Sequence, residues 1–155
     1  MKTLVLGLGN PILSDDGVGF RVIEALRDRL DPGQATVMET GVGGLGLLDL
    51  LTGYDRAIIV DAMQTAGGEP GKVCRLEPGV LESTRHAASP HDVNFATALE
   101  LGHRLGMALP REIVIFGIEV ADATTFGEEC TPKVRQAIPL CVEMVLRELN
   151  GGVHA

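Results

Sequence analysis

Short apolar runs that stop abruptly at polar or turn residues constrain the fold of this chain more than any other feature. Residues 3–8 are almost wholly apolar and end at Gly9-Asn10-Pro11, and residues 56–62 and 113–118 have the same character. A continuous apolar run of this length is typical of a β-strand that is covered on both faces. The pattern therefore predicts a sheet buried between two layers of other structure.

Helical periodicity fills the stretches between these runs. Apolar positions recur at helical spacing over several segments, and Ser89-Pro90 and Thr131-Pro132 both have the pattern of a helix cap followed by proline. The glycine-rich link at 67–71 is too short for a parallel crossover, so the run that follows it is expected to be antiparallel. The expected strands are 3–8, 35–39, 56–62, 72–76 and 113–118, and the expected helices are 18–30, 47–51, 89–105 and 131–149.

This order predicts an α/β fold: a three-layer α/β/α sandwich around a five-stranded mixed sheet with one antiparallel strand. The 155 residues suit one domain, 1–155, in which residues 151–155 form a frayed tail. No internal repeat or linker divides the chain.

Charge and composition exclude several classes of partner. The net charge of −8, the sequence pI near 4.9 and the 3% aromatic content argue against binding to nucleic acid. No apolar stretch approaches the roughly 18 residues of a membrane span, and no signal segment is evident, so we expect a cytoplasmic protein. Cys74, Cys130 and Cys141 are widely spaced and odd in number, and we expect reduced thiols.

The first strand is followed by a segment that begins like a dinucleotide-binding fingerprint, with Gly7 and Gly9 in place and Glu39 near the end of the second strand. The third glycine position, however, is Ile12. Asp15 and Asp16 would also place negative charge where a pyrophosphate should bind. We therefore expect no organic cofactor.

Three polar side chains are expected at the edge where the parallel strands end. Asp16 follows the first strand, Asp61 ends the third, and His91 stands at the start of a predicted helix. Each alone has a plain structural explanation, as a helix cap, a turn cap or a surface histidine. Together they could form a ligand set of two oxygens and one nitrogen, which suits a divalent transition metal and water-activating chemistry. No motif for a covalent nucleophile is visible.

A larger set of motifs is specific to one family. The chain resembles the hydrogenase maturation proteases over nearly its whole length, in the order and spacing of its motifs. They are Leu6-Gly7-Leu8-Gly9-Asn10, Asp15-Asp16-Gly17-Val18-Gly19, Thr40-Gly41, Gly44-Leu45, Leu47-Leu48, Ile59-Val60-Asp61-Ala62, Ser89-Pro90-His91, Gly117-Ile118-Glu119 and Thr131-Pro132.

The resemblance implies a phosphorylase/hydrolase-like fold and a cytoplasmic endopeptidase. Such an enzyme removes the C-terminal extension of a nickel–iron hydrogenase large-subunit precursor after nickel insertion, and it recognises the nickel that the precursor carries. By the same resemblance Asp16, Asp61 and His91 are the metal-engaging and catalytic residues. Many relatives have glutamate where this chain has Asp16, so this carboxylate has a shorter reach. The neighbouring Asp15 is expected to cap the following helix and to orient Asp16. We expect a monomer whose partner is the nickel-loaded precursor.

Two other functions remain open at this point. A non-catalytic nickel-sensing chaperone would use the same three ligands to hold the precursor without cutting it. The opening Leu6-Gly7-Leu8-Gly9-Asn10-Pro11 also resembles peptidyl-tRNA hydrolases, although the histidine-asparagine segment of that family is missing and the acidity argues against tRNA.

Overall fold

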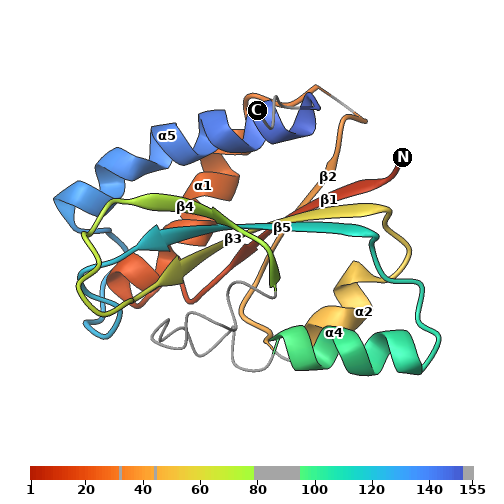
Figure 1. Cartoon of the computed structure of the whole chain (residues 1–155). Coiled ribbons are helices and arrows are strands. Elements are labelled where there is room, and N and C mark those ends of the chain that lie inside the picture. Colours follow the sequence, from red (N-terminus) through yellow and green to blue (C-terminus); the bar gives the residue numbers. More distant parts are fainter. Residues whose placement is uncertain (32, 44, 79–94, 152–155) are drawn as a thin grey trace.

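The computed structural model describes residues 1–31, 33–43, 45–78 and 95–151. In chain order the elements are β1 (Thr3–Leu8), the short 3-10 helix η1 (Ser14–Gly17), α1 (Val18–Arg27), β2 (Thr36–Thr40), α2 (Gly46–Leu51), β3 (Arg56–Met63), β4 (Val73–Leu76), α4 (Phe95–Arg104), β5 (Glu112–Glu119) and α5 (Pro132–Leu149) (Figure 1). The predicted sandwich with a mixed sheet is confirmed.

The five strands form one sheet in the order β2-β1-β3-β5-β4. All neighbouring pairs are parallel except β4 and β5, which are antiparallel. Only nine residues, from 64 to 72, separate β3 from β4, and so short a link cannot carry the crossover that a parallel pair needs. The parallel strands β2, β1, β3 and β5 consequently all end at the same edge of the sheet, called here the carboxyl edge.

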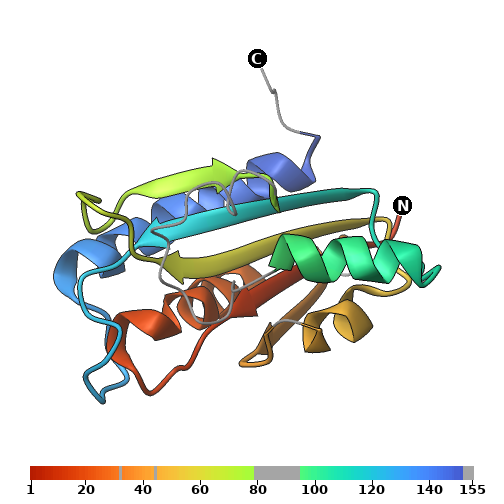
Figure 2. The same ribbon diagram turned by 60° about the horizontal axis from the view of Figure 1, so that its bottom comes forward.

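Two helical layers bury the two faces of this sheet. Helices α1 and α5 lie against one face and contact each other, while α2 and α4 cover the other face; Figure 2 shows α4 in front of the sheet and α5 behind it. Side chains alternate between the faces as strand geometry requires. Ile58 and Val60 of β3 pack with α1 and α5, whereas Ala57 and Ile59 pack with α2 and α4.

The element boundaries depart only slightly from the prediction. Strand β2 is shifted by one residue relative to 35–39, and both β3 and β5 extend one or two residues further than expected. The expected helix 89–105 is described from Phe95 to Arg104, so its predicted start lies outside the described residues, as does most of the predicted tail at 151–155. In the described part of the chain, no helix is long and apolar enough to cross a membrane.

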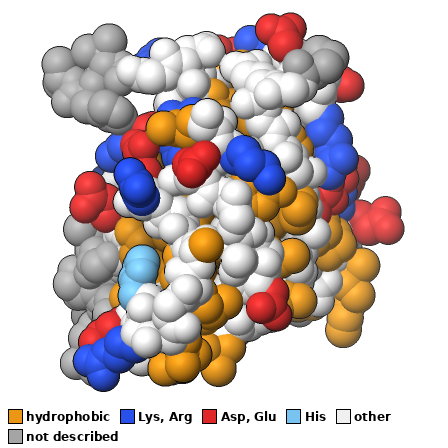
Figure 3. All heavy atoms as spheres, turned by 90° about the vertical axis from the view of Figure 1, so that its right-hand side faces the viewer, with side chains coloured by type: hydrophobic (Ala, Val, Ile, Leu, Met, Phe, Trp, Pro, Cys, Tyr) orange, Lys and Arg blue, Asp and Glu red, His pale blue; other side chains and the backbone are white. Residues whose placement is uncertain are grey.

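At the opposite end of the molecule, where the parallel strands begin, the described residues show no concentration of charge of one sign (Figure 3). Figure 3 shows that hydrophobic, basic and acidic side chains are interspersed over this face. The buried acidic residues that follow all belong to the carboxyl edge, except for Glu148 near the end of α5.

Candidate active site

The chain after β1 folds back on itself and buries Asp16. The backbone N–H of Asn10 donates to the carbonyl oxygen of Asp16 at 3.3 Å and to its carboxylate Oδ2 at 3.0 Å. Gly9 adopts a positive φ of 143°, and a Cβ atom there would overlap the Asp16 carbonyl oxygen. Asp16 is only 5% exposed. A carboxylate is thus held in place by the backbone at the carboxyl edge.

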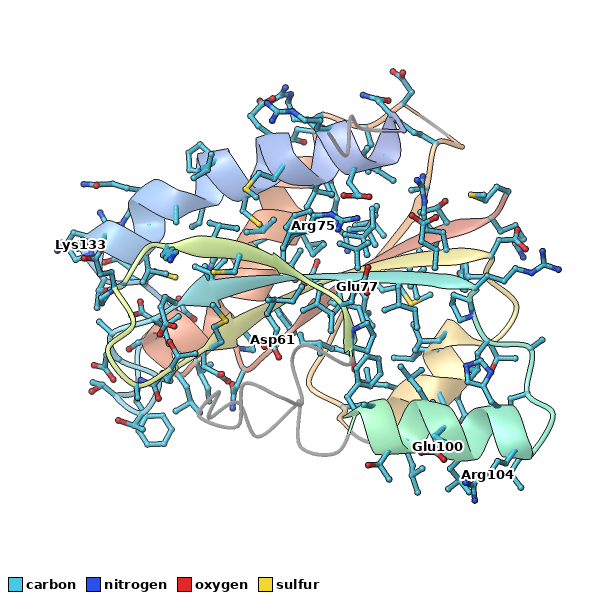
Figure 4. The ribbon with its side chains drawn as sticks, viewed as in Figure 1. Asp61, Arg75, Glu77, Glu100, Arg104 and Lys133 are labelled. Carbon is cyan, nitrogen blue, oxygen red and sulfur yellow. The ribbon has the colours of Figure 1, made fainter. Side chains whose placement is uncertain are left out.

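Asp61 lies inside β3, opposite Gly117 of β5, and is 1% exposed. Its Oδ1 accepts a hydrogen bond from the N–H of Ala62 at 2.8 Å, but Ala62 still belongs to β3, so this bond is not the turn cap that the sequence suggests. Strand alternation puts its side chain on the same face as Ala57 and Ile59, the face covered by α2 and α4 (Figure 4). A buried carboxylate among apolar side chains is costly unless it is hydrogen-bonded or paired with a cation.

The structure brings Asp16 and Asp61 to the same edge of the sheet. The 3-10 helix η1, which contains Asp16, contacts β3, which contains Asp61. This contact depends on Gly19, where a Cβ atom would lie 2.6 Å from the carbonyl oxygen of Val60 and 2.5 Å from that of Leu8. Glycine at the start of α1 therefore lets the helix press onto the ends of β1 and β3.

The third predicted ligand, His91, lies outside the described residues. Within the residues that the structure does describe, no group of three histidine, cysteine or acidic side chains is placed to hold a metal ion. Asp16 and Asp61 are thus the two members of the predicted ligand set that lie within the described residues.

Asp15 does not have the capping role that the sequence suggests. Neither η1 nor α1 has a side-chain cap. The fully buried Asp15 instead accepts hydrogen bonds on Oδ2 from the backbone N–H groups of Ala121 and Asp122, each at 3.0 Å. Thr131 likewise does not cap α5 with its side chain, because its hydroxyl donates to Asp15 Oδ2. Asp15 therefore ties the loop after β5 to η1.

Glu119, the last residue of the Gly117-Ile118-Glu119 motif, is a further buried acid. It is the last residue of β5, is 3% exposed, and accepts hydrogen bonds from the N–H of Thr65, at 3.0 Å, and from the Thr65 hydroxyl. It stands opposite Met63, two residues beyond the pair of Asp61 and Gly117, so it lies on the same face as Asp61. Glu119 follows an apolar run in the sequence, as Asp61 does, and this position is the sequence feature that could have identified it as a candidate site residue.

A cavity of about 500 Å³ adjoins Glu119. Its lining includes Met63 at the end of β3, Thr65 after this strand, Lys72 before β4, and Cys74 within β4. A cavity that combines apolar, cationic and acidic groups next to the carboxyl edge is large enough for peptide side chains.

Fold and site together define an α/β protein with buried carboxylates at the carboxyl edge of its sheet, where ligands and substrates of such folds bind. Comparison with known proteins identifies its family. The model of the family described as hydrogenase maturation protease matches residues 20–148. The chain belongs to this family, and is therefore a peptidase by family.

Individual relatives agree with this assignment. The chain is 30% identical to the hydrogenase 2 maturation protease of Escherichia coli (strain K12), with 100% of this chain and 95% of the relative covered. It is also 30% identical to the hydrogenase expression/formation protein HupD of Bradyrhizobium diazoefficiens, over 96% of this chain and 78% of that protein.

Solved structures show the same fold. The hydrogenase maturating endopeptidase HybD from Escherichia coli superposes with a TM-score of 0.84 at 29% identity, over 97% of this chain and 93% of that one. The [NiFe] hydrogenase maturation protease HybD from Thermococcus kodakarensis gives a TM-score of 0.74 at 25% identity, over 96% and 99%. The predicted family and fold are both confirmed, and peptidyl-tRNA hydrolase becomes the weaker interpretation.

Proposed function

We propose that this protein is the endopeptidase that removes the C-terminal extension from a nickel–iron hydrogenase large-subunit precursor after nickel has been inserted. The observation that carries the proposal is the burial of Asp16 and Asp61 at one edge of the sheet, in a chain that matches the protease family over residues 20–148. We further propose that it acts in the cytoplasm, as a monomer.

In this proposal Asp16, Asp61 and His91 engage the nickel that the precursor carries. The two described side chains fit that role, because each is buried and each is oriented by a backbone N–H donor. Metal ligands are commonly held in this way by a second layer of hydrogen bonds. Two carboxylate oxygens and one imidazole nitrogen suit a divalent first-row metal.

A metal ion held there would polarise the scissile carbonyl group or a water molecule. The protein's own part is to bind the precursor, to orient the peptide beside Asp16 and Asp61, and to limit access of bulk water. Neither Cys130 nor Cys141 is suited to act as a nucleophile, because both side chains are buried. Burial raises the pKa of the Cys130 thiol, and Cys141 is fully buried with a pKa raised to about 12.

The test uses a purified precursor prepared with and without nickel. Each form is incubated with the protein, and the mass of the precursor is followed over time. Loss of a C-terminal peptide only from the nickel-loaded form is the expected result. Binding of both forms without any loss of mass would instead favour the nickel-sensing chaperone, and equal cleavage of both forms would remove nickel as the recognition element.

A further inference from the structure

Two large apolar side chains are exposed beside the candidate active site. Phe126, in the loop after β5, is 79% exposed, and Ile12, in the loop after β1, is 49% exposed. Their loops are joined, because the N–H of Gly127 donates to the carbonyl oxygen of Ile12 at 2.8 Å and the N–H of Ser14 donates to that of Gly127 at 2.9 Å. We call these two side chains the Ile12–Phe126 patch.

The loop that presents Phe126 is held by side-chain hydrogen bonds on both sides. The carboxylate Oδ1 of Asp122 accepts from the N–H groups of Thr124 and Thr125, and the hydroxyl of Ser14 donates to the Thr125 carbonyl oxygen at 2.6 Å. On the other side of Phe126, Arg21 donates a hydrogen bond to the carbonyl oxygen of Glu128 at 2.8 Å. An aromatic side chain on such a loop loses little conformational entropy when a partner covers it.

Acidic groups border the patch. Glu128 and Glu129 are exposed two and three residues after Phe126. The hydrogen bonds from Thr125 and Thr124 lower the pKa of the Asp122 carboxyl and so favour its charged form. A complementary partner would therefore offer an apolar pocket bordered by lysine or arginine.

We propose that the Ile12–Phe126 patch is a docking surface for the folded body of the hydrogenase large-subunit precursor. The proposal rests on the proposed function. The patch is continuous with the candidate site, because η1, which contains Asp16, begins two residues after Ile12. A precursor seated on the patch is thus anchored at the carboxyl edge while its extension reaches the carboxylates.

The test compares Phe126→Ser and Ile12→Ser with the unaltered protein on a nickel-loaded precursor. Truncation of a central aromatic contact typically weakens an interface strongly. We expect Kd and KM for the precursor to rise about tenfold or more in Phe126→Ser, and less in Ile12→Ser. The value of kcat should stay within about twofold, because the patch contributes to binding and not to the chemical step.

Leu105→Ser is the matched control. Leu105 is 69% exposed and follows α4 at the opposite end of the sheet, so its replacement should leave Kd and KM unchanged. The loss of affinity that we expect in Phe126→Ser should be equal for the nickel-loaded and the nickel-free precursor, since the patch does not contact the metal. A loss confined to the nickel-loaded form would assign Phe126 to the metal site and overturn the proposal.

Two further outcomes would also overturn the proposal. One is an unchanged Kd in both variants. The other is a dimer of this protein, seen by sedimentation without precursor, that Phe126→Ser dissociates, since a second copy would then be the occupant. The proposed function fails separately: if the unaltered protein binds the precursor but never cuts it, the effect of Phe126→Ser on Kd still decides whether the patch is the docking surface.

Discussion

The Asp15 carboxylate accepts hydrogen bonds from both donor groups of Thr131, 116 residues further along the chain. Its Oδ1 accepts the backbone N–H of Thr131 at 2.6 Å, and its Oδ2 accepts the hydroxyl at 2.8 Å. With the two bonds from Ala121 and Asp122, one buried side chain joins η1, the loop after β5 and the start of α5.

Replacement of Asp15 should therefore destabilise the fold. Asp15→Ala leaves several backbone N–H groups without their acceptor, and we expect the free energy of unfolding to fall by more than about 2 kcal/mol in denaturant titrations. The free energy of unfolding of Asp15→Asn should lie between that of Asp15→Ala and that of the unaltered protein, because the amide oxygen can still accept hydrogen bonds from these N–H groups. Equal stability of Asp15→Ala and the unaltered protein would contradict this role.

The strands could be predicted from the sequence, but the hydrogen-bond partners of Asp15 could not. The strands were predictable because residues 3–8, 56–62 and 113–118 are apolar runs, and apolar pattern is a local property. The partners of Asp15 lie more than 100 residues away, so local pattern favoured a helix cap that the structure does not contain. Pairing over such distances depends on the three-dimensional fold.

For the candidate site, the rule that parallel strands end at one edge correctly placed Asp16 and Asp61 on the same edge. It did not single out Glu119, because the expected strand stopped at residue 118 and left this acid outside the sheet. The apolar character ends at Ile118, but the backbone pairing continues for one more residue, to Met63 and Glu119.

Conversion of either candidate carboxylate to an amide should abolish processing without loss of the fold. Asp16→Asn and Asp61→Asn keep an oxygen that can accept the N–H of Asn10 or Ala62. They remove the negative charge, and we expect the rate of precursor cleavage to fall by more than about 100-fold. Mass spectrometry of the precursor measures the rate.

Glu148→Gln is the control for those two variants. Glu148 is 5% exposed, like Asp16, but it lies near the end of α5, where Arg75 donates to its carboxylate at 2.7 and 3.1 Å. This variant should lose stability and keep its cleavage rate. Normal cleavage by Asp61→Asn would remove Asp61 from the proposed site.

His91→Ala should also abolish processing, because the family resemblance makes His91 the nitrogen ligand of the proposed set. Since His91 lies outside the described residues, the prediction rests on the resemblance and on its Ser89-Pro90-His91 motif. The thermal midpoint of unfolding should match that of the unaltered protein, while the precursor keeps its extension. A fully active His91→Ala protein would exclude metal coordination by this residue.

The three free thiols should differ in reactivity. Cys141 is fully buried, and burial raises its pKa from 9.0 to about 12, whereas Cys74 is half-buried. A thiol reagent at mildly alkaline pH should label Cys74 first and Cys141 only on unfolding, as peptide masses would show. Rapid labelling of Cys141 in the folded protein would contradict its burial.

The same shift predicts how stability depends on pH. The folded state keeps the Cys141 proton up to about pH 12, whereas the unfolded chain loses it near pH 9.0. Between these two values the folded state therefore binds more protons than the unfolded chain. The contribution of the Cys141 thiol to the free energy of unfolding is thus complete below pH 9.0 and declines as the pH rises above it. Cys141→Ala should weaken that alkaline decline in denaturant titrations.

Gly9→Ala tests whether the backbone fold-back positions Asp16. A Cβ atom at Gly9 would overlap the Asp16 carbonyl oxygen, so alanine must displace Asp16 from the carboxyl edge and cleavage should fall sharply. Gly53→Ala is the matched control, because Gly53 also has a positive φ, of 93°, but nothing lies within 4 Å of the added methyl group. It should lose about 1 kcal/mol of stability from backbone strain alone and cleave normally. If Gly9→Ala, folded by circular dichroism, cleaved as fast as Gly53→Ala, the position of Asp16 would not depend on this contact.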